Sequence, residues 1–128
     1  MEVVFLIGRL MAALMYLLLG VNHFVNLPEL IDYAHRRKVP VPLVSVPLTG
    51  LALIVGSFSI GLGFHPTVGV IVVVVFLLLS ALLAHRPSTQ DDVRAWQQEK
   101  LNFMRNMALA GTTLMLLAIP SWPYSVTP

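Results

Sequence analysis

Cysteine is absent from this chain of 128 residues, and charged residues make up only 11% of it. The lack of cysteine excludes disulfides, thiolate metal sites and thiol redox chemistry. Such a low charge content, together with 57% hydrophobic residues and a mean hydropathy of +0.83, lies far outside the range of soluble domains. We therefore predict an integral membrane protein. In such a protein the positions of the basic residues indicate its orientation in the membrane, and we expect no nucleic-acid partner.

The sequence also lacks the motifs of hydrolytic and nucleotide-driven enzymes. It contains no GxSxG, no HExxH, no glycine-rich phosphate loop and no paired carboxylates within its apolar runs. It has no flavin, iron–sulfur or copper pattern, and its four histidines form no metal-ligand motif. We predict no metal site and no covalently bound cofactor, and we do not expect the isolated chain to be a self-contained enzyme.

Long apolar runs, in contrast, fill most of the chain, at residues 3–21, 43–62, 67–84 and 101–119. Each is close to the roughly 20 residues that cross a hydrocarbon core of about 30 Å. The valines at 70, 72, 73, 74 and 75 are typical of a strand, but the length of their run favours a membrane helix. We predict an all-α fold, a single four-helix transmembrane bundle over residues 1–128, in which the polar pair Asn22-His23 ends the first span.

The polar stretch before the fourth run predicts a helix longer than the membrane is thick. Ser88, Thr89 and Asp91 are typical of a helix start, with a hydroxyl cap and an acidic first turn. No Gly or Pro follows until Gly111. We expect one helix from about Thr89 to Ile119, with its polar first third on the cytoplasmic side of the membrane.

The connection between the first two runs has a helical pattern of its own. Leu27, Leu30 and Ile31 recur at helical spacing, and the basic run 36–38 follows them. We predict a short interfacial helix whose apolar face lies among lipid headgroups and whose basic end faces anionic lipid. A plain loop with solvated charges is the alternative.

Basic residues are distributed unevenly between the two sides of the predicted bundle. The first and third connections and the polar start of the fourth helix carry seven of the eight Lys and Arg residues: Arg36, Arg37, Lys38, Arg86, Arg94, Lys100 and Arg105. By the positive-inside rule these segments face the cytoplasm, so both termini are expected outside. Glu2 rather than a basic region precedes the first span, so we expect no removable signal peptide.

Several short motifs run in a fixed order along almost the whole chain: Gly8-Arg9, Gly20-Val21-Asn22-His23-Phe24, Tyr33, Val39-Pro40-Val41-Pro42, Pro47-Leu48-Thr49-Gly50, Gly56, His85 and the segment 102–111. Their order and spacing resemble the DoxX family of small membrane proteins. The resemblance implies a four-helix protein of a bacterial or archaeal plasma membrane. Family members often have Gly in place of Lys38 and a Glu in the second span, where this chain has Leu53.

The resemblance also implies a connection to quinone chemistry. The family is named from a thiosulfate:quinone oxidoreductase, and other relatives resemble assembly factors or accessory subunits of membrane oxidoreductase complexes. Arg9, about two turns inside the first span, lies within the resemblance. It could bind a lipid headgroup, a quinone carbonyl or an acidic partner, or it could simply extend to the outer interface.

Four polar residues, His23, His85, Asn102 and Asn106, are expected near the cytoplasmic ends of three spans. Because successive spans run in opposite directions, these residues are expected at the same depth in the membrane. We predict that they contact one another. They could hold a quinone head, or they could only form the hydrogen bonds that fix the bundle. Two histidines could also ligate a haem, which we disfavour because no supporting motif accompanies them. His35 and His65 are predicted to be surface residues.

Two functions of different class remain open. We predict an accessory or assembly subunit of a membrane-bound, quinone-linked oxidoreductase complex, without a catalytic centre of its own. The alternative is a quinone-binding redox subunit of an enzyme similar to thiosulfate:quinone oxidoreductase. A small pore or transporter is a third option, disfavoured because few polar residues are expected at mid-membrane. Either subunit role requires other membrane subunits as partners, and a homo-oligomer is also compatible with the sequence.

Overall fold

The computed structural model describes residues 1–87 and 91–127, and within these ranges the chain is helical without any strand. The helices, in chain order, are α1 Glu2–Val25, α2 Leu27–Arg36, α3 Pro42–Leu62, α4 Pro66–Leu79, a π-helical turn Ser80–Ala84, α5 Val93–Leu114 and a 3₁₀ turn Met115–Ala118. The all-α prediction is confirmed. The short predicted helix between the first two spans is also confirmed, as α2.

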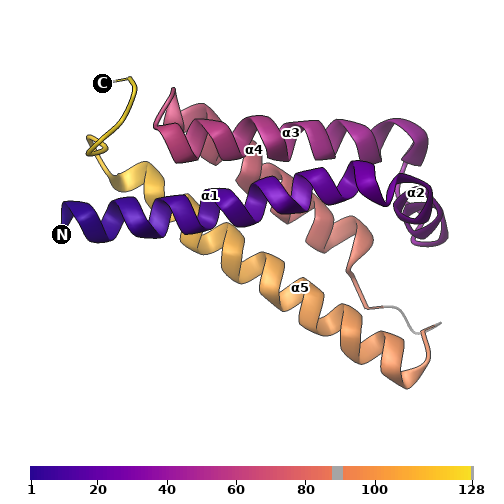
Figure 1. The fold of residues 1–128 in the computed structure, drawn as a ribbon. Helices are drawn as coiled ribbons and strands as arrows, with labels where there is room; N and C mark the ends of the chain where they lie inside the picture. Colours follow the sequence, from indigo (N-terminus) through magenta and orange to yellow (C-terminus); the bar gives the residue numbers. More distant parts are fainter. Residues whose placement is uncertain (88–90, 128) are drawn as a thin grey trace.

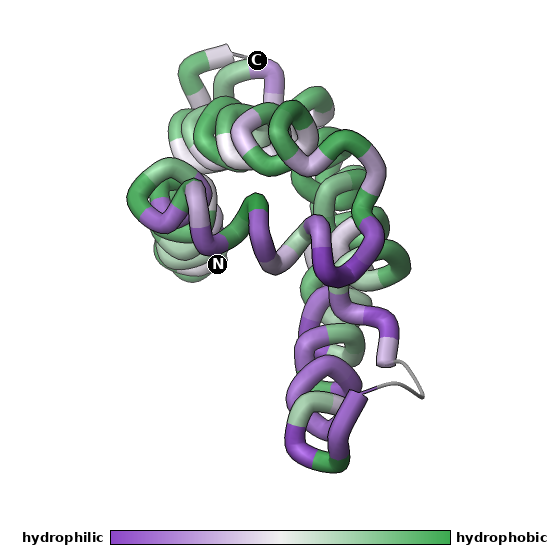
Figure 2. The backbone as a smooth tube through the Cα atoms, turned by 90° about the vertical axis from the view of Figure 1, so that its right-hand side faces the viewer, coloured by the Kyte–Doolittle hydropathy of each residue, from purple (hydrophilic) through white to green (hydrophobic). Residues whose placement is uncertain are grey.

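Within the described ranges, three helices are long and apolar enough to cross a membrane: Glu2–Val25, Pro42–Leu62 and Pro66–Ala84, the last combining α4 with the π turn. Figure 2 shows that hydrophilic residues gather instead around the start of α5, at the lower end of the molecule. The protein is thus a membrane protein with an all-α fold. The fourth crossing, through the second half of α5, is not among these three candidate spans and stays a prediction.

The helices form an open arrangement rather than a closed ring. α1 packs along α3, α3 packs on α4, and α4 packs on α5. The core between α3 and α4 consists of side chains without solvent exposure, namely Leu53, Ile60, Val70, Val73 and Leu77. α5 crosses α1 obliquely, and the two helices diverge toward α2 (Figure 1). They meet where the Tyr16 hydroxyl group and Thr113 Oγ1 share a hydrogen bond of 2.7 Å.

Two glycines allow α1 and α3 to approach closely near their α2 ends. A Cβ atom added to Gly20 would lie 2.9 Å from the carbonyl oxygen of Gly50, and one added to Gly50 would lie 2.6 Å from the Cβ of His23. Both distances are shorter than carbon and oxygen atoms tolerate, so any side chain here would push the helices apart. This close contact fixes the position of His23.

Two helix ends differ from the prediction. α1 continues through Asn22 and His23 to Val25, and the Asn22 carbonyl accepts a 3.0 Å hydrogen bond from Asn26, so the polar pair does not end the helix. α5 begins at Val93, later than predicted, because the carboxylate of Asp92 caps it by accepting a 2.7 Å bond from the Ala95 amide. The predicted caps at 88 and 89 lie outside the described residues.

The chain ends in a segment that folds back over the α3–α4 turn. The amide of Val126 donates to the Leu62 carbonyl at 3.0 Å, and the hydroxyl group of Thr127 donates to the Gly63 carbonyl at 2.9 Å. The first residue and this segment lie at the same end of the molecule (Figure 1). This arrangement follows from the alternating directions of α1, α3, α4 and α5.

Candidate functional site: a cavity between α1, α2 and α5

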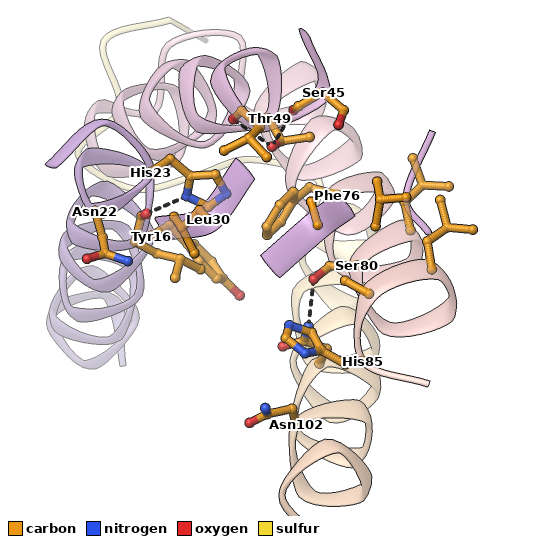
Figure 3. A pocket seen from close by; sticks show the side chains of 18 of the residues that line it. Tyr16, Asn22, His23, Leu30, Ser45, Thr49, Phe76, Ser80, His85 and Asn102 are labelled. Carbon is orange, nitrogen blue, oxygen red and sulfur yellow. Dashed lines mark hydrogen bonds between the residues drawn. The ribbon is translucent and has the colours of Figure 1, made fainter. Parts of the chain in front are cut away.

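A cavity of about 950 Å³ lies in the angle where α1 and α5 diverge. All five α-helices and the π turn contribute to its wall. Much of the lining is apolar, including Met11, Met15, Leu19, Phe76, Leu79 and Leu109. Figure 3 shows Ser45 and Thr49 on one side of the space and His85 and Asn102 on the other. Size and lining both fall within the range of small-molecule sites, typically about 300–1,000 Å³.

Three ionisable side chains meet where α2, the π turn and α5 come together. The Tyr33 hydroxyl group donates to Glu99 Oε1 at 2.6 Å, and His85 Nδ1 lies 2.9 Å from Glu99 Oε2. His85 Nδ1 also lies 3.1 Å from the Tyr33 hydroxyl oxygen. Tyr33 and His85 line the cavity, whereas Glu99, only 7% exposed, is outside the lining. Both carboxylate oxygens of a buried acid therefore have partners, as burial of a charge requires.

Burial and the adjacent carboxylate act on Tyr33 in the same direction. Removal from water raises the pKa of the Tyr33 phenol, and the hydrogen bond to Glu99 raises that pKa further. Tyr33 therefore remains a neutral hydrogen-bond donor at physiological pH. It holds the Glu99 carboxylate in a fixed orientation toward His85.

Arg37 fastens α2 to the end of the π turn. Its Nε donates to the Ala84 carbonyl at 2.8 Å, another of its nitrogens donates to the Arg86 carbonyl, and the guanidinium pairs with Asp91 at 2.9 Å. Helix ends leave their last carbonyls without partners inside the helix, and a cation is favoured there. Arg37 satisfies these carbonyls and so keeps α2 against this end of the cavity.

A π-helical turn forms part of the cavity wall. Its wider hydrogen bond runs from the His85 amide to the Ser80 carbonyl at 3.0 Å. Ser80 accepts a 3.2 Å hydrogen bond from the Asn106 amide nitrogen across to α5. Single π turns of this kind occur frequently at functional sites.

The four predicted cluster residues line this one cavity, but each has its hydrogen-bond partners elsewhere. His23 donates to the Leu19 carbonyl at 2.8 Å, Asn102 accepts from Gln98 at 3.3 Å, and the partners of His85 and Asn106 are those above. Among the described residues, no hydrogen bond joins two of the four. Hydrogen bonding among the four is therefore not what holds them at this level, although they do gather around one cavity as expected of a single site. Each residue satisfies its hydrogen bonds within its own helix or with an adjacent one, and the cavity lies between them.

One hydroxyl group on the wall has no partner among the described residues. Ser45 Oγ is buried without a hydrogen bond, although Ser45 lines the cavity. Most buried hydroxyl groups are hydrogen-bonded, because leaving one unpaired costs about 1–3 kcal/mol. Ser45 Oγ therefore leaves an unfilled hydrogen bond behind the cavity wall, since the oxygen itself is shielded from the open space.

Arg9 lies away from the cavity and binds the C-terminal segment. Its guanidinium donates to the Pro123 and Tyr124 carbonyls at 2.8 and 3.0 Å, and its side chain packs against the rings of Phe5 and Trp122. Arg9 is only 4% exposed. These contacts give it a structural role in holding the tail against α1. His35 and His65 are exposed, as predicted.

Sequence reasoning did not identify Tyr33, Arg37 or Glu99 as site residues. Glu99 belongs to the polar first third of the predicted fourth helix, which is expected on the cytoplasmic side of the membrane, where a charged side chain does not by itself indicate a site. A signal was nevertheless present, because Glu99, Asn102 and Asn106 are spaced by three and four residues and share one face of α5. No group of three or more potential metal-binding side chains occurs among the described residues.

Comparison with known proteins identifies a family for most of the chain. The family model DoxX matches residues 4–86, from α1 to the residue after His85, and so includes Tyr33 and Arg37. No curated protein and no solved structure matched the chain. The match covers more than half of the sequence, and the chain therefore belongs to the DoxX family.

Proposed function

We propose that this protein is a quinone-binding accessory subunit of a membrane-bound oxidoreductase complex, with electrons supplied by another subunit. The observation that carries the proposal is the cavity of about 950 Å³ between α1 and α5. A quinone has an apolar tail and a ring with two carbonyl oxygens, so its site needs an apolar wall and a few hydrogen-bond donors. Family membership supports the same class of ligand.

The residues of the cavity fit such a ligand. The methionine and leucine side chains of α1 supply an apolar wall for a tail. The Asn102 and His85 side chains, on the wall opposite Ser45 and Thr49, can donate to a carbonyl oxygen of the ring (Figure 3). When bound, the quinone would supply two-electron redox chemistry, while these residues orient its ring and exclude water.

The apolar outer faces of α1 and α3 support a role within an assembly in the membrane. Large side chains such as Leu14, Leu18, Leu51 and Phe58 are about half exposed on these faces. Lipid or the helices of other subunits can cover them. We propose the plasma membrane as the location, with both termini outside and α2 on the cytoplasmic side, where the basic residues gather.

Purification in mild detergent tests the proposal. We expect the protein to copurify with subunits that carry a flavin, haem or iron–sulfur centre, and with quinone in the extracted lipid. Added short-chain benzoquinone should raise the melting temperature, because a ligand that binds only the folded protein stabilises it.

Asn106→Leu should reduce the quinone-induced rise in melting temperature, since Asn106 lines the cavity. Gln97→Leu, at an exposed position of α5 outside the lining, should retain it. A protein purified without redox subunits and without quinone, and whose melting temperature does not respond to benzoquinone, would show that the proposal is wrong.

A further inference from the structure

The contacts of His85 determine where its protons lie. The single proton of the Tyr33 hydroxyl group is donated to Glu99 Oε1, the shortest of its contacts at 2.6 Å, since charge-assisted bonds are the strong ones. His85 Nδ1 therefore faces two oxygen atoms, Glu99 Oε2 at 2.9 Å and the Tyr33 hydroxyl at 3.1 Å, neither of which has a proton for it. With Glu99 ionised, Nδ1 carries hydrogen, and a neutral His85 has its lone pair on Nε2.

The proton content of the Glu99–His85 pair consequently decides whether His85 Nε2 accepts or donates a hydrogen bond to a ligand. With one shared proton, Nε2 is a hydrogen-bond acceptor. With a second proton, Nε2 becomes a donor, whether the other proton is on Nδ1 or on the carboxylate. Among the described residues, Nε2 has no hydrogen-bond partner of its own, and His85 lines the cavity.

We propose that the Glu99–His85 pair selects the oxidation state of the cavity's ligand by its proton content: with one proton it binds a hydroxyl head, as in a hydroquinone, and with two it binds a carbonyl head, as in a quinone. This inference rests on the proposed function and adds a proton-linked choice between the two forms of the ligand. A hydroxyl group can donate to an acceptor Nε2, whereas a carbonyl oxygen needs a donor.

The surrounding charged groups leave this pair as the proton-exchanging unit. Arg37 from α2 pairs with Asp91 at 2.9 Å, so each of these groups has a partner of opposite charge. Tyr33 stays protonated because burial raises its pKa. His23 from α1 and Arg105 from α5 also line the cavity, and the Nδ1 of His23 is committed to the Leu19 carbonyl.

Calorimetric binding of a short-chain benzoquinone and of its hydroquinone, measured without oxygen between about pH 5 and about pH 8, where histidine titrates, tests the inference. Quinone affinity should fall as the pH rises, and hydroquinone affinity should rise. Each should change by at most about tenfold per pH unit, because one proton is linked to binding.

Three variants separate this mechanism from a structural role. His85→Gln should remove both trends, because an amide does not titrate in this range. Glu99→Gln should favour the quinone over the hydroquinone at every pH tested, because the amide NH2 group that replaces Oε2 donates to Nδ1 and so leaves the hydrogen on Nε2. His35→Gln, at an exposed position outside the lining, should keep both trends unchanged.

The outcomes distinguish the two proposals. If both ligands bind with affinities that do not depend on pH, or if His85→Gln keeps the trends, the proton-linked selection is wrong while a quinone site remains. If neither ligand binds the unmodified protein at any pH, the proposed function fails as well.

Discussion

Glu99 shows how a charged side chain becomes tolerable inside a membrane protein. It is 7% exposed, and its two carboxylate oxygens are occupied by Tyr33 and His85. A buried carboxylate without partners would be strongly destabilising or would become protonated. Tyr33 thus contributes more as a donor to this acid than as an aromatic ring.

Removing the Tyr33 hydroxyl group should therefore destabilise the protein. We expect Tyr33→Phe to lower the free energy of unfolding by about 1–3 kcal/mol, because Glu99 loses a buried donor. The raised pKa of Tyr33 sets the pH dependence. The difference between the two proteins should be constant below the ordinary phenol pKa of about 10 and should shrink above it, because the unfolded chain then ionises Tyr33 while burial keeps the phenol protonated in the folded protein.

Denaturant unfolding at about pH 8 and at about pH 11, on either side of that ordinary pKa, measures this difference. Tyr124→Phe is the control, since Tyr124 is 61% exposed. Equal stability of Tyr33→Phe and the unmodified protein at about pH 8 would show that the hydroxyl group does not support Glu99.

At the scale of elements, α2 ends in a turn that its sequence does not favour. Lys38 has a left-handed backbone with φ of 60°. Its amide donates to the His35 carbonyl at 3.1 Å, and the Val39 amide donates to the Ala34 carbonyl at 2.9 Å. These two bonds form a Schellman motif, whose left-handed residue is usually Gly. A glycine in place of Lys38, which the resemblance implies for other family members, would adopt this geometry without strain.

Lys38→Gly should stabilise the protein. A left-handed conformation costs a non-glycine residue roughly 1–2 kcal/mol, and glycine's greater freedom in the unfolded chain offsets about half of the gain. We expect a net increase of up to about 1 kcal/mol in the free energy of unfolding. Lys100→Gly, at an exposed position inside α5, should instead cost about 1 kcal/mol. A loss of stability in Lys38→Gly would mean that the left-handed turn is wrong.

The long helices could be predicted from apolar runs, because length alone forces such runs into helices in lipid. The helix ends could not be predicted as well. The polar pair Asn22-His23 is typical of a turn, yet α1 packs closely on α3 at Gly20 and continues as a helix to Val25. The π turn at 80–84 has no sequence signal. Its contacts are made with Asn106 of α5 and with Arg37, and both residues are distant from it in sequence.

At the scale of the whole molecule, the cavity depends on the open packing order α1, α3, α4, α5 more than on any single residue. A closed bundle would fill its centre with side chains, whereas here α1 and α5 diverge from the Tyr16–Thr113 contact and leave a cavity. Sequence placed His23, His85, Asn102 and Asn106 at one level, and they do share this cavity. It could not show the space between them, which depends on the tilt of α5.

Photolabelling with an azido-substituted short-chain quinone, followed by mass spectrometry of peptides from the purified protein, tests the central claim most directly. If the cavity is the quinone site, label should appear on lining residues such as Met15, Phe76 and Leu109, and excess unmodified quinone should suppress it. Label confined to exposed outer positions such as Leu14 and Phe58, without suppression by excess quinone, would contradict the account.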